Sequence, residues 1–221
     1  MTSSRSYRGA AASERVHRRR TSLVDAAVEA FGTVGYRKAS VESICSLAGV
    51  SKRYFYESFT DSEALLLASY ERCADEIHTA MVDAVAAAGD DLSEQVRAAL
   101  GGYFRAIDAD QKRARITLLE ILGVSPAVDQ AWAEQTRRFA ASVRALAAPA
   151  LAESAVPSAQ QQVIAEGIIG AITTTATLWL LQARRRSVKQ LVDATHLLVV
   201  TTIEDFAARR SLPLLSYIRY V

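Results

Sequence analysis

The hydrophobic residues of this 221-residue chain recur mostly at steps of three and four, the period of an amphipathic helix. Alternating apolar and polar runs are nearly absent, and glycine and proline are sparse, so the pattern predicts an all-α fold. Nine helices are expected, close to residues 15–33, 41–48, 51–58, 62–88, 92–109, 113–122, 126–148, 157–183 and 188–209. The inward stripe of the first is expected to comprise Val16, Leu23, Val24, Ala27, Val28 and Phe31.

Residues 39–59 carry the most informative pattern, which is two short helices around a turn that contains glycine. Ser40 suits the N-cap of the first helix, Gly49 its left-handed C-terminus, and Ser51 the N-cap of the second. The expected inward positions are Val41, Ile44, Leu47 and Ala48 in the first helix and Phe55 and Phe59 in the second. Such a pair is a helix-turn-helix, a unit that places its second helix in the major groove of DNA.

The outward face of the second helix suits nucleic acid, because it carries Lys52, Arg53, Tyr54 and Tyr56. Lysine and arginine neutralise phosphates, arginine also reads guanine edges, and tyrosine hydroxyls donate to phosphate oxygens. The same side chains also occur on solvated helix faces of proteins that do not bind DNA. On these residues alone, both interpretations stay open.

The flanks of this unit resemble those of a known family. The stretch AAVEAFGTVGYRKASVESICSLAGVSKRYFYESFTDSEALL has Phe31, Gly35-Tyr36, Ala48-Gly49-Val50-Ser51, Tyr56 and Glu63-Ala64-Leu65 in the order and spacing of the TetR family of bacterial transcription regulators. The resemblance covers about residues 22–67. It implies that residues 51–58 form the recognition helix and that Ser40 contacts a phosphate from the helix before it. It also implies that Lys52 and Tyr56 occupy DNA-contact positions.

The predicted DNA-binding residues of the unit are therefore Ser40, Ser51, Lys52, Arg53, Tyr54 and Tyr56. Four positions depart from the family pattern, the first being Ala39, which replaces a frequent threonine. Arg53 stands where the family often has glycine, Tyr54 where it often has threonine or serine, and Ser62 where it usually has lysine. These departures leave the operator sequence open and predict that one phosphate contact near Ser62 is missing or replaced.

The charge distribution supports DNA binding. Residues 1–58 hold ten Lys and Arg against five Asp and Glu, a net charge of +5, whereas the whole chain is +2 and residues 59–221 therefore carry −3. Residues 1–14 are expected to be a flexible basic arm, from which Arg5 and Arg8 could enter a neighbouring minor groove or simply stay solvated. The expected domains are DNA-binding at 15–60 and ligand-binding and dimerisation at 61–210, with a tail at 211–221 of no assigned role.

The remaining composition points away from catalysis and from export. The N-terminus lacks the apolar segment of a secretory signal, so a cytoplasmic protein is expected. The two cysteines, Cys45 and Cys73, do not form a disulfide framework, and no metal-ligand spacing is present. Because no nucleophile–base set, carboxylate pair or phosphate loop is evident, neither an enzyme nor a cofactor is expected.

The C-terminal half predicts pairing with a second copy. Residues 167–183 are uncharged over seventeen positions, but this is at the short limit for a membrane span and the segment contains four threonines. A helix buried in a soluble assembly fits better, and the last helix has an apolar face of its own. Two such helices from each subunit would form a four-helix homodimer interface. The candidate interface residues are Ile168, Ile172, Thr175, Trp179, Leu191, Thr195, Leu198 and Thr202.

The other C-terminal helices are expected to enclose a hydrophobic small-molecule effector. The candidate lining residues are Tyr70, Tyr103, Phe104, Ile107, Leu118, Leu119, Leu122, Trp132 and Phe139, each of which could equally be plain core. Gly101 and Gly102 lie in mid-helix, which indicates either close helix packing or room for a ligand.

The sequence thus predicts a homodimeric regulator that binds a pseudo-palindromic operator in double-stranded DNA and no membrane. A repressor that an effector releases from DNA is favoured. Two alternatives remain open. One is a small-molecule-binding or catalytic helical protein whose N-terminal motif is only structural, and the other is a DNA-binding regulator without an effector.

Overall fold

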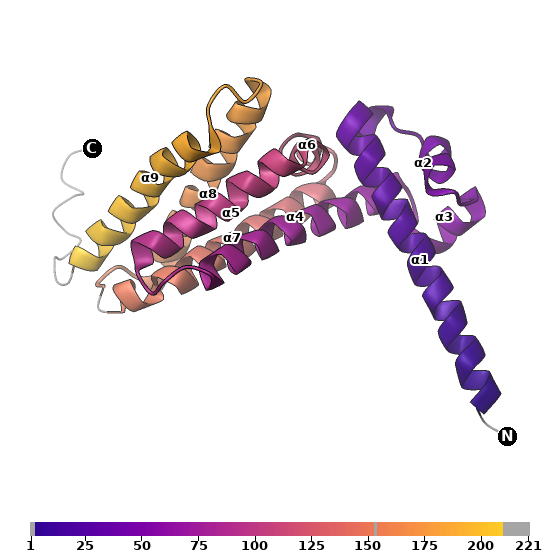
Figure 1. Ribbon diagram of the computed structural model, residues 1–221, viewed down its shortest axis with the longest axis horizontal. Helices are drawn as coiled ribbons and strands as arrows, with labels where there is room; N and C mark the ends of the chain where they lie inside the picture. Colours follow the sequence, from indigo (N-terminus) through magenta and orange to yellow (C-terminus); the bar gives the residue numbers. More distant parts are fainter. Residues whose placement is uncertain (1–2, 153, 210–221) are drawn as a thin grey trace. The chain divides into compact units, whose positions relative to one another are not determined.

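The computed structural model describes residues 3–152 and 154–209 of the chain, with side chains from residue 14 onward in the first helix. The described residues form nine α-helices, a 3-10 turn and a π turn, and contain no strand, so the predicted all-α fold is confirmed (Figure 1). The helices are α1 (Ser3–Val34), α2 (Val41–Ala48), α3 (Lys52–Ser58), α4 (Ser62–Ala86), α5 (Leu92–Ala109), α6 (Gln111–Arg115), α7 (Pro126–Leu151), α8 (Ser158–Leu181) and α9 (Val188–Ala208). The predicted tail at 211–221 lies outside the described residues.

The helices divide into two compact units. Unit 1 consists of Met1–Glu76 and Ala109–Trp132, and unit 2 of Ile77–Asp108 and Ala133–Val221. Unit 1 extends beyond the predicted DNA-binding range of residues 15–60, because its hydrophobic core also takes in the first part of α4 and residues that follow α6.

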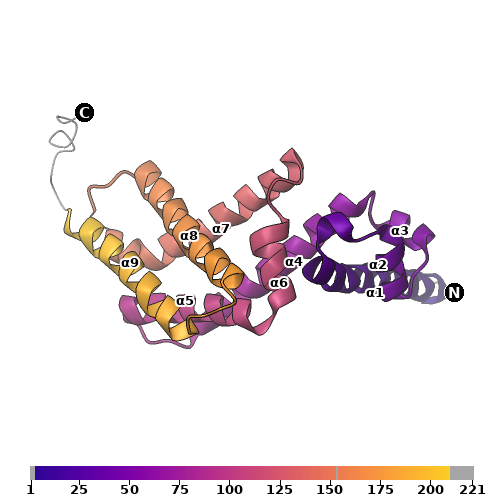
Figure 2. The ribbon, with the colours of Figure 1, turned by 90° about the horizontal axis from the view of Figure 1, so that it is seen from above.

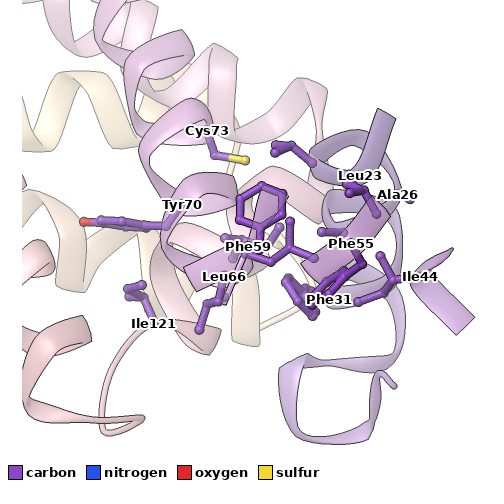
Figure 3. Close-up of a cluster of buried hydrophobic side chains, with 14 of the residues drawn as sticks. Leu23, Ala26, Phe31, Ile44, Phe55, Phe59, Leu66, Tyr70, Cys73 and Ile121 are labelled. Carbon is purple, nitrogen blue, oxygen red and sulfur yellow. The ribbon is translucent and has the colours of Figure 1, made fainter. Parts of the chain in front are cut away.

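The core of unit 1 fixes the positions of α1, α2 and α3. Figure 3 shows Phe31 of α1, Ile44 of α2 and Phe55 of α3 gathered in this core, and all three side chains are fully buried. Burying each such side chain contributes about 1.5–3 kcal/mol. The short helices α2 and α3 therefore depend on this shared core for their stability, since isolated helices of this length are marginal in water.

The first helix begins earlier than expected. The predicted arm at residues 1–14 is helical from Ser3 onward, and the run of alanines at 10–12 favours helix. Whether this part is flexible stays a prediction. The expectation that Val16 faces inward is wrong, because its side chain is 55 % exposed; the buried stripe of α1 begins only at Leu23.

The segment after α5 differs most from its predicted form. The carboxylate of Asp110 accepts hydrogen bonds from the backbone N–H groups of Lys112 and Arg113, so α6 begins at Gln111 instead of 113. The helix then widens into a π turn at Ile116–Glu120. Gly32 of α1 lies against this segment so closely that a Cβ there would come within 2.3 Å of the Lys112 Cβ. The glycine therefore permits close approach of α1 and α6.

In unit 2, the two mid-helix glycines of α5 have different surroundings. A Cβ on Gly102 would lie 2.6 Å from the carbonyl oxygen of Ala80 and 3.0 Å from the Met81 Cα, both in α4. The three heavy atoms nearest to a Cβ on Gly101 all belong to the guanidinium group of Arg105. Close helix packing is therefore the reason for Gly102.

The helices α8 and α9 lie side by side, as both views show (Figures 1 and 2). The turn between them contains Ala183 and Arg184 with φ angles of 54° and 55°, the left-handed region. The indole N–H of Trp179 donates to the carbonyl oxygen of Arg186 at 2.8 Å, which ties the turn to α8. Ser187 then forms a capping box with Gln190 at the start of α9.

The helix α7 continues through Pro149, although it was expected to weaken before this residue. Pro149 lies in the last turn, where few further hydrogen bonds depend on the missing N–H. Within unit 2, α7 and α8 share a small core of Ala140, Ala165 and Ile169.

Candidate nucleic-acid interface

Two of the three caps that the sequence predicts in the helix-turn-helix, those at Ser40 and Gly49, are present. The Ser40 hydroxyl accepts from the Ser43 N–H, and the Ser43 hydroxyl accepts from the Ser40 N–H, which is a complete capping box on α2. Gly49 ends α2 in the left-handed conformation, with φ 66° and ψ 30°. Ser51 is at the N-cap position of α3 with extended backbone, but its side chain makes no capping hydrogen bond. Its hydroxyl therefore lies exposed at the start of α3.

The inward faces of both helices are largely as predicted. Ile44, Phe55 and Phe59 are buried. Leu47 is a correction, because its side chain is 56 % exposed, whereas Cys45 is buried in its place. The helix packs on α1 and α3 through the side of α2 that carries positions 44 and 45. The apolar stripe predicted from the spacing of Val41, Ile44, Leu47 and Ala48 therefore wrongly included Leu47.

The outward face of α3 presents Lys52, Arg53 and Tyr56 to solvent, as expected. Both cations are paired in the protein without DNA. The Lys52 ammonium contacts the Glu42 carboxylate of α2, and the Arg53 guanidinium lies 3.0 Å from the Glu57 carboxylate one turn later. These pairs are exposed, so each contributes little to folding stability.

Two arginines of α1 lie against α3, and the sequence analysis did not single them out. The Cζ of Arg19 lies 3.6 Å from the ring centroid of Tyr54, which is half-buried. The Cζ of Arg20 lies 4.2 Å from the ring centroid of Phe59, and its guanidinium donates to the Ser58 carbonyl oxygen at 2.8 Å. Arg20 thereby caps the C-terminus of α3. No periodicity links positions 19 and 54, so the residue pattern contained no signal for either contact.

The remaining predicted DNA-binding residues are placed as follows. Ser40 is exposed at the N-terminus of α2. Arg5 and Arg8 lie in the helical part of α1 whose side chains are outside the described residues. The Ser62 hydroxyl lies 3.4 Å from the Tyr36 hydroxyl, so it is engaged within unit 1.

A polar clamp holds the loop between α1 and α2. The Glu120 carboxylate of the π turn accepts from the Tyr36 backbone N–H at 2.8 Å and from the Arg115 Nε at 2.7 Å. The Arg115 guanidinium also donates to the Thr33 carbonyl oxygen at 2.9 Å, at the C-terminal end of α1. Gly35 lies next to both side chains with φ 91°, a conformation that favours glycine. The clamp therefore fixes the point at which the chain leaves α1 for the helix-turn-helix.

The predicted effector-lining residues are divided between the two units. In unit 1, Tyr70 is buried in the core, Leu118, Leu119 and Trp132 are half-buried, and Leu122 is 51 % exposed. In unit 2, Tyr103, Phe104 and Ile107 are buried and Phe139 is half-buried beside His78. The exposure of Leu122 makes it a poor lining residue, since it follows the π turn into a bend. The effector pocket otherwise stays a prediction.

Five of the eight predicted dimer-interface residues are buried within the protomer. These are Ile168, Ile172, Trp179, Leu191 and Thr195, whereas Thr175 and Thr202 are half-buried and Leu198 is 44 % exposed. These five side chains are covered within the protomer and leave little surface for a second copy, and the dimer interface itself stays a prediction. The large apolar residues that are exposed on these helices are Val163, Leu178, Leu181, Leu197 and Leu198.

Both cysteines behave as buried apolar side chains. Burial raises the pKa of the Cys45 thiol, and it raises the pKa of the Cys73 thiol to about 12. Burial also raises the pKa of the Tyr70 hydroxyl. Within residues 3–152 and 154–209, no group of three or more His, Cys, Asp or Glu side chains could hold a metal ion.

One described helix, α8, is long and apolar enough to cross a membrane by length and composition alone. The core helix of a soluble protein passes the same test, and six residues of α8 are buried within the protomer.

Comparison with known proteins agrees with this geometry. A family described as "Bacterial regulatory proteins, tetR family" matches residues 23–69, which span the helix-turn-helix. The HTH-type transcriptional activator FasR of Mycolicibacterium smegmatis is 27 % identical over 177 residues, which cover 80 % of this chain and 79 % of FasR. The solved structure of FadR from Bacillus subtilis in complex with stearoyl-CoA aligns with a TM-score of 0.70 at 19 % identity, over 82 % of this chain and 97 % of that one. The fatty acid degradation regulator FadR from Bacillus halodurans aligns with a TM-score of 0.71 at 20 % identity, over 82 % and 94 % of the two chains.

Proposed function

The chain belongs to the TetR family of bacterial transcription regulators, and we propose that it reads a pseudo-palindromic operator with α3 in the major groove. The observation that carries this proposal is the capped pair α2–α3, which buries Ile44 and Phe55 while Lys52, Arg53 and Tyr56 face solvent. Ser40 and Ser51 lie at the N-termini of the two helices, where hydroxyl and backbone N–H groups favour a phosphate.

DNA binding is tested with a fluorescent duplex taken from upstream of the chain's own gene. We expect anisotropy to report binding that exceeds binding to a scrambled duplex and that weakens steeply with salt. Lys52→Ala and Tyr56→Ala should weaken binding without changing the unfolding transition. Equal binding to both duplexes would contradict sequence-specific recognition, and full binding by both variants would assign the motif a purely structural role.

We further propose a homodimer, formed through a face of α8 and α9 other than the one first predicted. Three exposed apolar side chains, two glycines and one threonine recur along α8 at steps of three and four; these are Val163, Gly167, Gly170, Thr174, Leu178 and Leu181. A Cβ on Gly167 or Gly170 would meet nothing within 4 Å in the protomer, so this strip is open to a second helix. A contiguous apolar surface of this kind typically marks a protein interface.

The dimer is tested by light scattering of the purified chain, whose protomer mass is 24.0 kDa. We expect twice this mass for the unmodified chain and the protomer mass for Leu178→Asp combined with Leu197→Asp. Val82→Asp is the matched control, because Val82 and Leu178 are both 49 % exposed but Val82 lies on α4. A dimer that survives the double substitution would place the interface elsewhere.

As effector, we propose a long-chain acyl-CoA. The support is the likeness to FadR from Bacillus subtilis, whose structure was solved in complex with stearoyl-CoA. A ligand that binds one conformation better than the other shifts the population by no more than that difference in affinity.

The effector is tested by thermal unfolding of the chain with stearoyl-CoA, with free CoA and stearate as controls. At one hundred times its dissociation constant, a specific ligand stabilises the folded chain by about 2.7 kcal/mol. We expect this shift for stearoyl-CoA alone, together with a change in operator affinity. Equal shifts with stearate would indicate a fatty-acid effector. If none of these compounds shifts the unfolding temperature, the regulator binds a different effector or has no effector.

For the sign of regulation, we propose repression that is relieved when the effector binds. The alternative is activation, because the relative FasR is described as a transcriptional activator. Transcription in vitro from the chain's own promoter distinguishes the two, because a repressor lowers transcript yield on addition and an activator raises it. We also propose a cytoplasmic location and no catalytic activity, since the relatives compared are transcription regulators.

A further inference from the structure

Arg19 of α1 is placed at the edge of the face that α3 presents to DNA. Its guanidinium lies 3.6 Å over the ring of Tyr54, and within the described part of the chain it forms no ion pair with a carboxylate. Tyr54 is half-buried, whereas its neighbours in the sequence are the exposed Arg53 and the buried Phe55. The stacked arginine therefore borders the exposed surface of the recognition helix.

The chemistry of the stack leaves the guanidinium able to bind an anion. Arginine carries its five N–H donors in the plane of the group, and stacking occupies only one face of that plane. The aromatic ring thus holds the cation in place while its donor edge remains free for a phosphate, which arginine binds with two parallel hydrogen bonds.

Unlike Arg19, the two cations of α3 are each paired with a carboxylate. Lys52 is paired with Glu42 and Arg53 with Glu57, so each must exchange a carboxylate for a phosphate on binding DNA. Arg20, the neighbour of Arg19, donates one hydrogen bond through Nη1 to the Ser58 carbonyl oxygen, which ties it to the C-terminal end of α3. Of these four cations, Arg19 is the one for which the described residues provide neither an ion pair nor a hydrogen bond.

Resting on the proposed function and deepening it, we infer that Arg19 is an additional DNA-binding residue that contacts a backbone phosphate beside the groove occupied by α3. Tyr54 is its positioning residue. The tyrosine acts on DNA through the ring that holds Arg19 and not by reading a base.

The experiment measures binding of the upstream duplex by anisotropy at several salt concentrations, with a scrambled duplex in parallel. The variants are Arg19→Ala, Tyr54→Phe, Tyr54→Ala and the double variant Arg19→Ala/Tyr54→Ala. Arg18→Ala is the matched control, because Arg18 is an exposed arginine on the same helix and its loss changes the net charge equally. Circular dichroism and urea unfolding of each variant report the fold.

We expect Arg19→Ala to weaken binding about tenfold, the value of one charge-assisted hydrogen bond. It should also reduce the slope of log K against log salt by about 1, as loss of one phosphate contact does. Tyr54→Phe should bind as the unmodified chain does, because the ring remains. Tyr54→Ala should weaken binding, and adding it to Arg19→Ala should cause no further loss.

Several outcomes would overturn the inference. Equal effects of Arg18→Ala and Arg19→Ala would mean that only net charge matters. Additive losses in the double variant would mean that Tyr54 contacts DNA itself. A relaxed sequence preference with an unchanged salt slope would assign Arg19 to a base. If Tyr54→Ala does not fold, Arg19→Ala and Tyr54→Phe still decide the case, and if the unmodified chain shows no preference for the upstream duplex, it is the proposed function that fails.

Discussion

The neighbouring glycines of α5 offer a test of how closely α4 and α5 pack. Gly102→Ala would place a Cβ 2.6 Å from the Ala80 carbonyl oxygen and 3.0 Å from the Met81 Cα, and both are backbone atoms that cannot rotate away. Gly101→Ala would place a Cβ 2.7 Å from a guanidinium nitrogen of Arg105, which is the flexible end of a side chain. The same substitution, one residue apart, therefore meets a fixed obstacle in one case and a movable one in the other.

The difference between the two variants isolates the cost of the close contact. Each substitution gains about 1 kcal/mol because alanine favours helix over glycine, and this gain cancels between them. Inserting a methyl group into a packed contact costs about 1–3 kcal/mol. We expect Gly101→Ala to unfold at a higher urea concentration than the unmodified chain, and Gly102→Ala to be less stable than Gly101→Ala by about 1–3 kcal/mol.

The assay is urea unfolding followed by circular dichroism at one fixed protein concentration, because dimerisation makes stability depend on concentration. The slope of the free energy against urea should be the same in both variants, so that the midpoint alone reports stability. If Gly102→Ala is as stable as Gly101→Ala, then α4 and α5 do not pack at the distance described here, and the reasoning fails.

Three further substitutions test single contacts. Glu120→Ala should lower the free energy of unfolding by about 1.5–3 kcal/mol, because the Tyr36 N–H loses a charged acceptor; unfolding in urea checks this, with Glu120→Gln expected to lose less. Ser40→Ala should cost about 1 kcal/mol through loss of the α2 cap, and Ser40→Thr should largely retain it. Burial raises the pKa of Cys73 from 9.0 to about 12, so this thiol should not react with a disulfide reagent at pH 8 until the chain is unfolded. Because that pKa is raised on folding, the stability from keeping Cys73 protonated is complete below pH 9 and is lost as the pH rises toward 12, and Cys73→Ala should show a smaller loss over that interval.

Local signals in the sequence predicted the local structure well. The cap at Ser40 and the left-handed turn at Gly49 follow from side-chain chemistry within a few residues, and both are present. The helix at 92–109 has the predicted bounds, because a clear apolar stripe is framed by polar breaks. Such features need no information from distant parts of the chain.

The sequence-based predictions were wrong where they had to decide which side of a helix is buried without knowing what the helix packs against. Residues 167–183 are apolar on nearly all sides, so their period does not say which side packs within the protomer. The prediction took Ile168 and Ile172 as the outer face, and they are buried inside. The prediction that Leu47 is buried was wrong for a different reason. Leu47 lies three positions after Ile44, which suggested burial, but no other element covers this position of the short helix α2.

Contacts between residues far apart in the chain could not be predicted from the sequence. The bond from the Tyr36 N–H to Glu120 joins residues that are 84 positions apart, and no motif links them. The stack of Arg19 on Tyr54 likewise depends on how α1 and α3 pack. These contacts are results of the fold, so single-sequence reasoning could only have found them after the packing was known.

The ion pairs on the recognition helix have a consequence for how the protein searches DNA. Glu42 and Glu57 occupy, in the free protein, the places that phosphate oxygens would take beside Lys52 and Arg53. If α3 binds DNA as proposed, these carboxylates would compete with phosphates, and both would have to be displaced before Lys52 and Arg53 could contact DNA. Such competition weakens every encounter by a similar amount, and only a site that adds base contacts recovers the loss. Because this cost is the same at every site, the two carboxylates would shorten residence on DNA in general and leave the discrimination between sites to the base contacts.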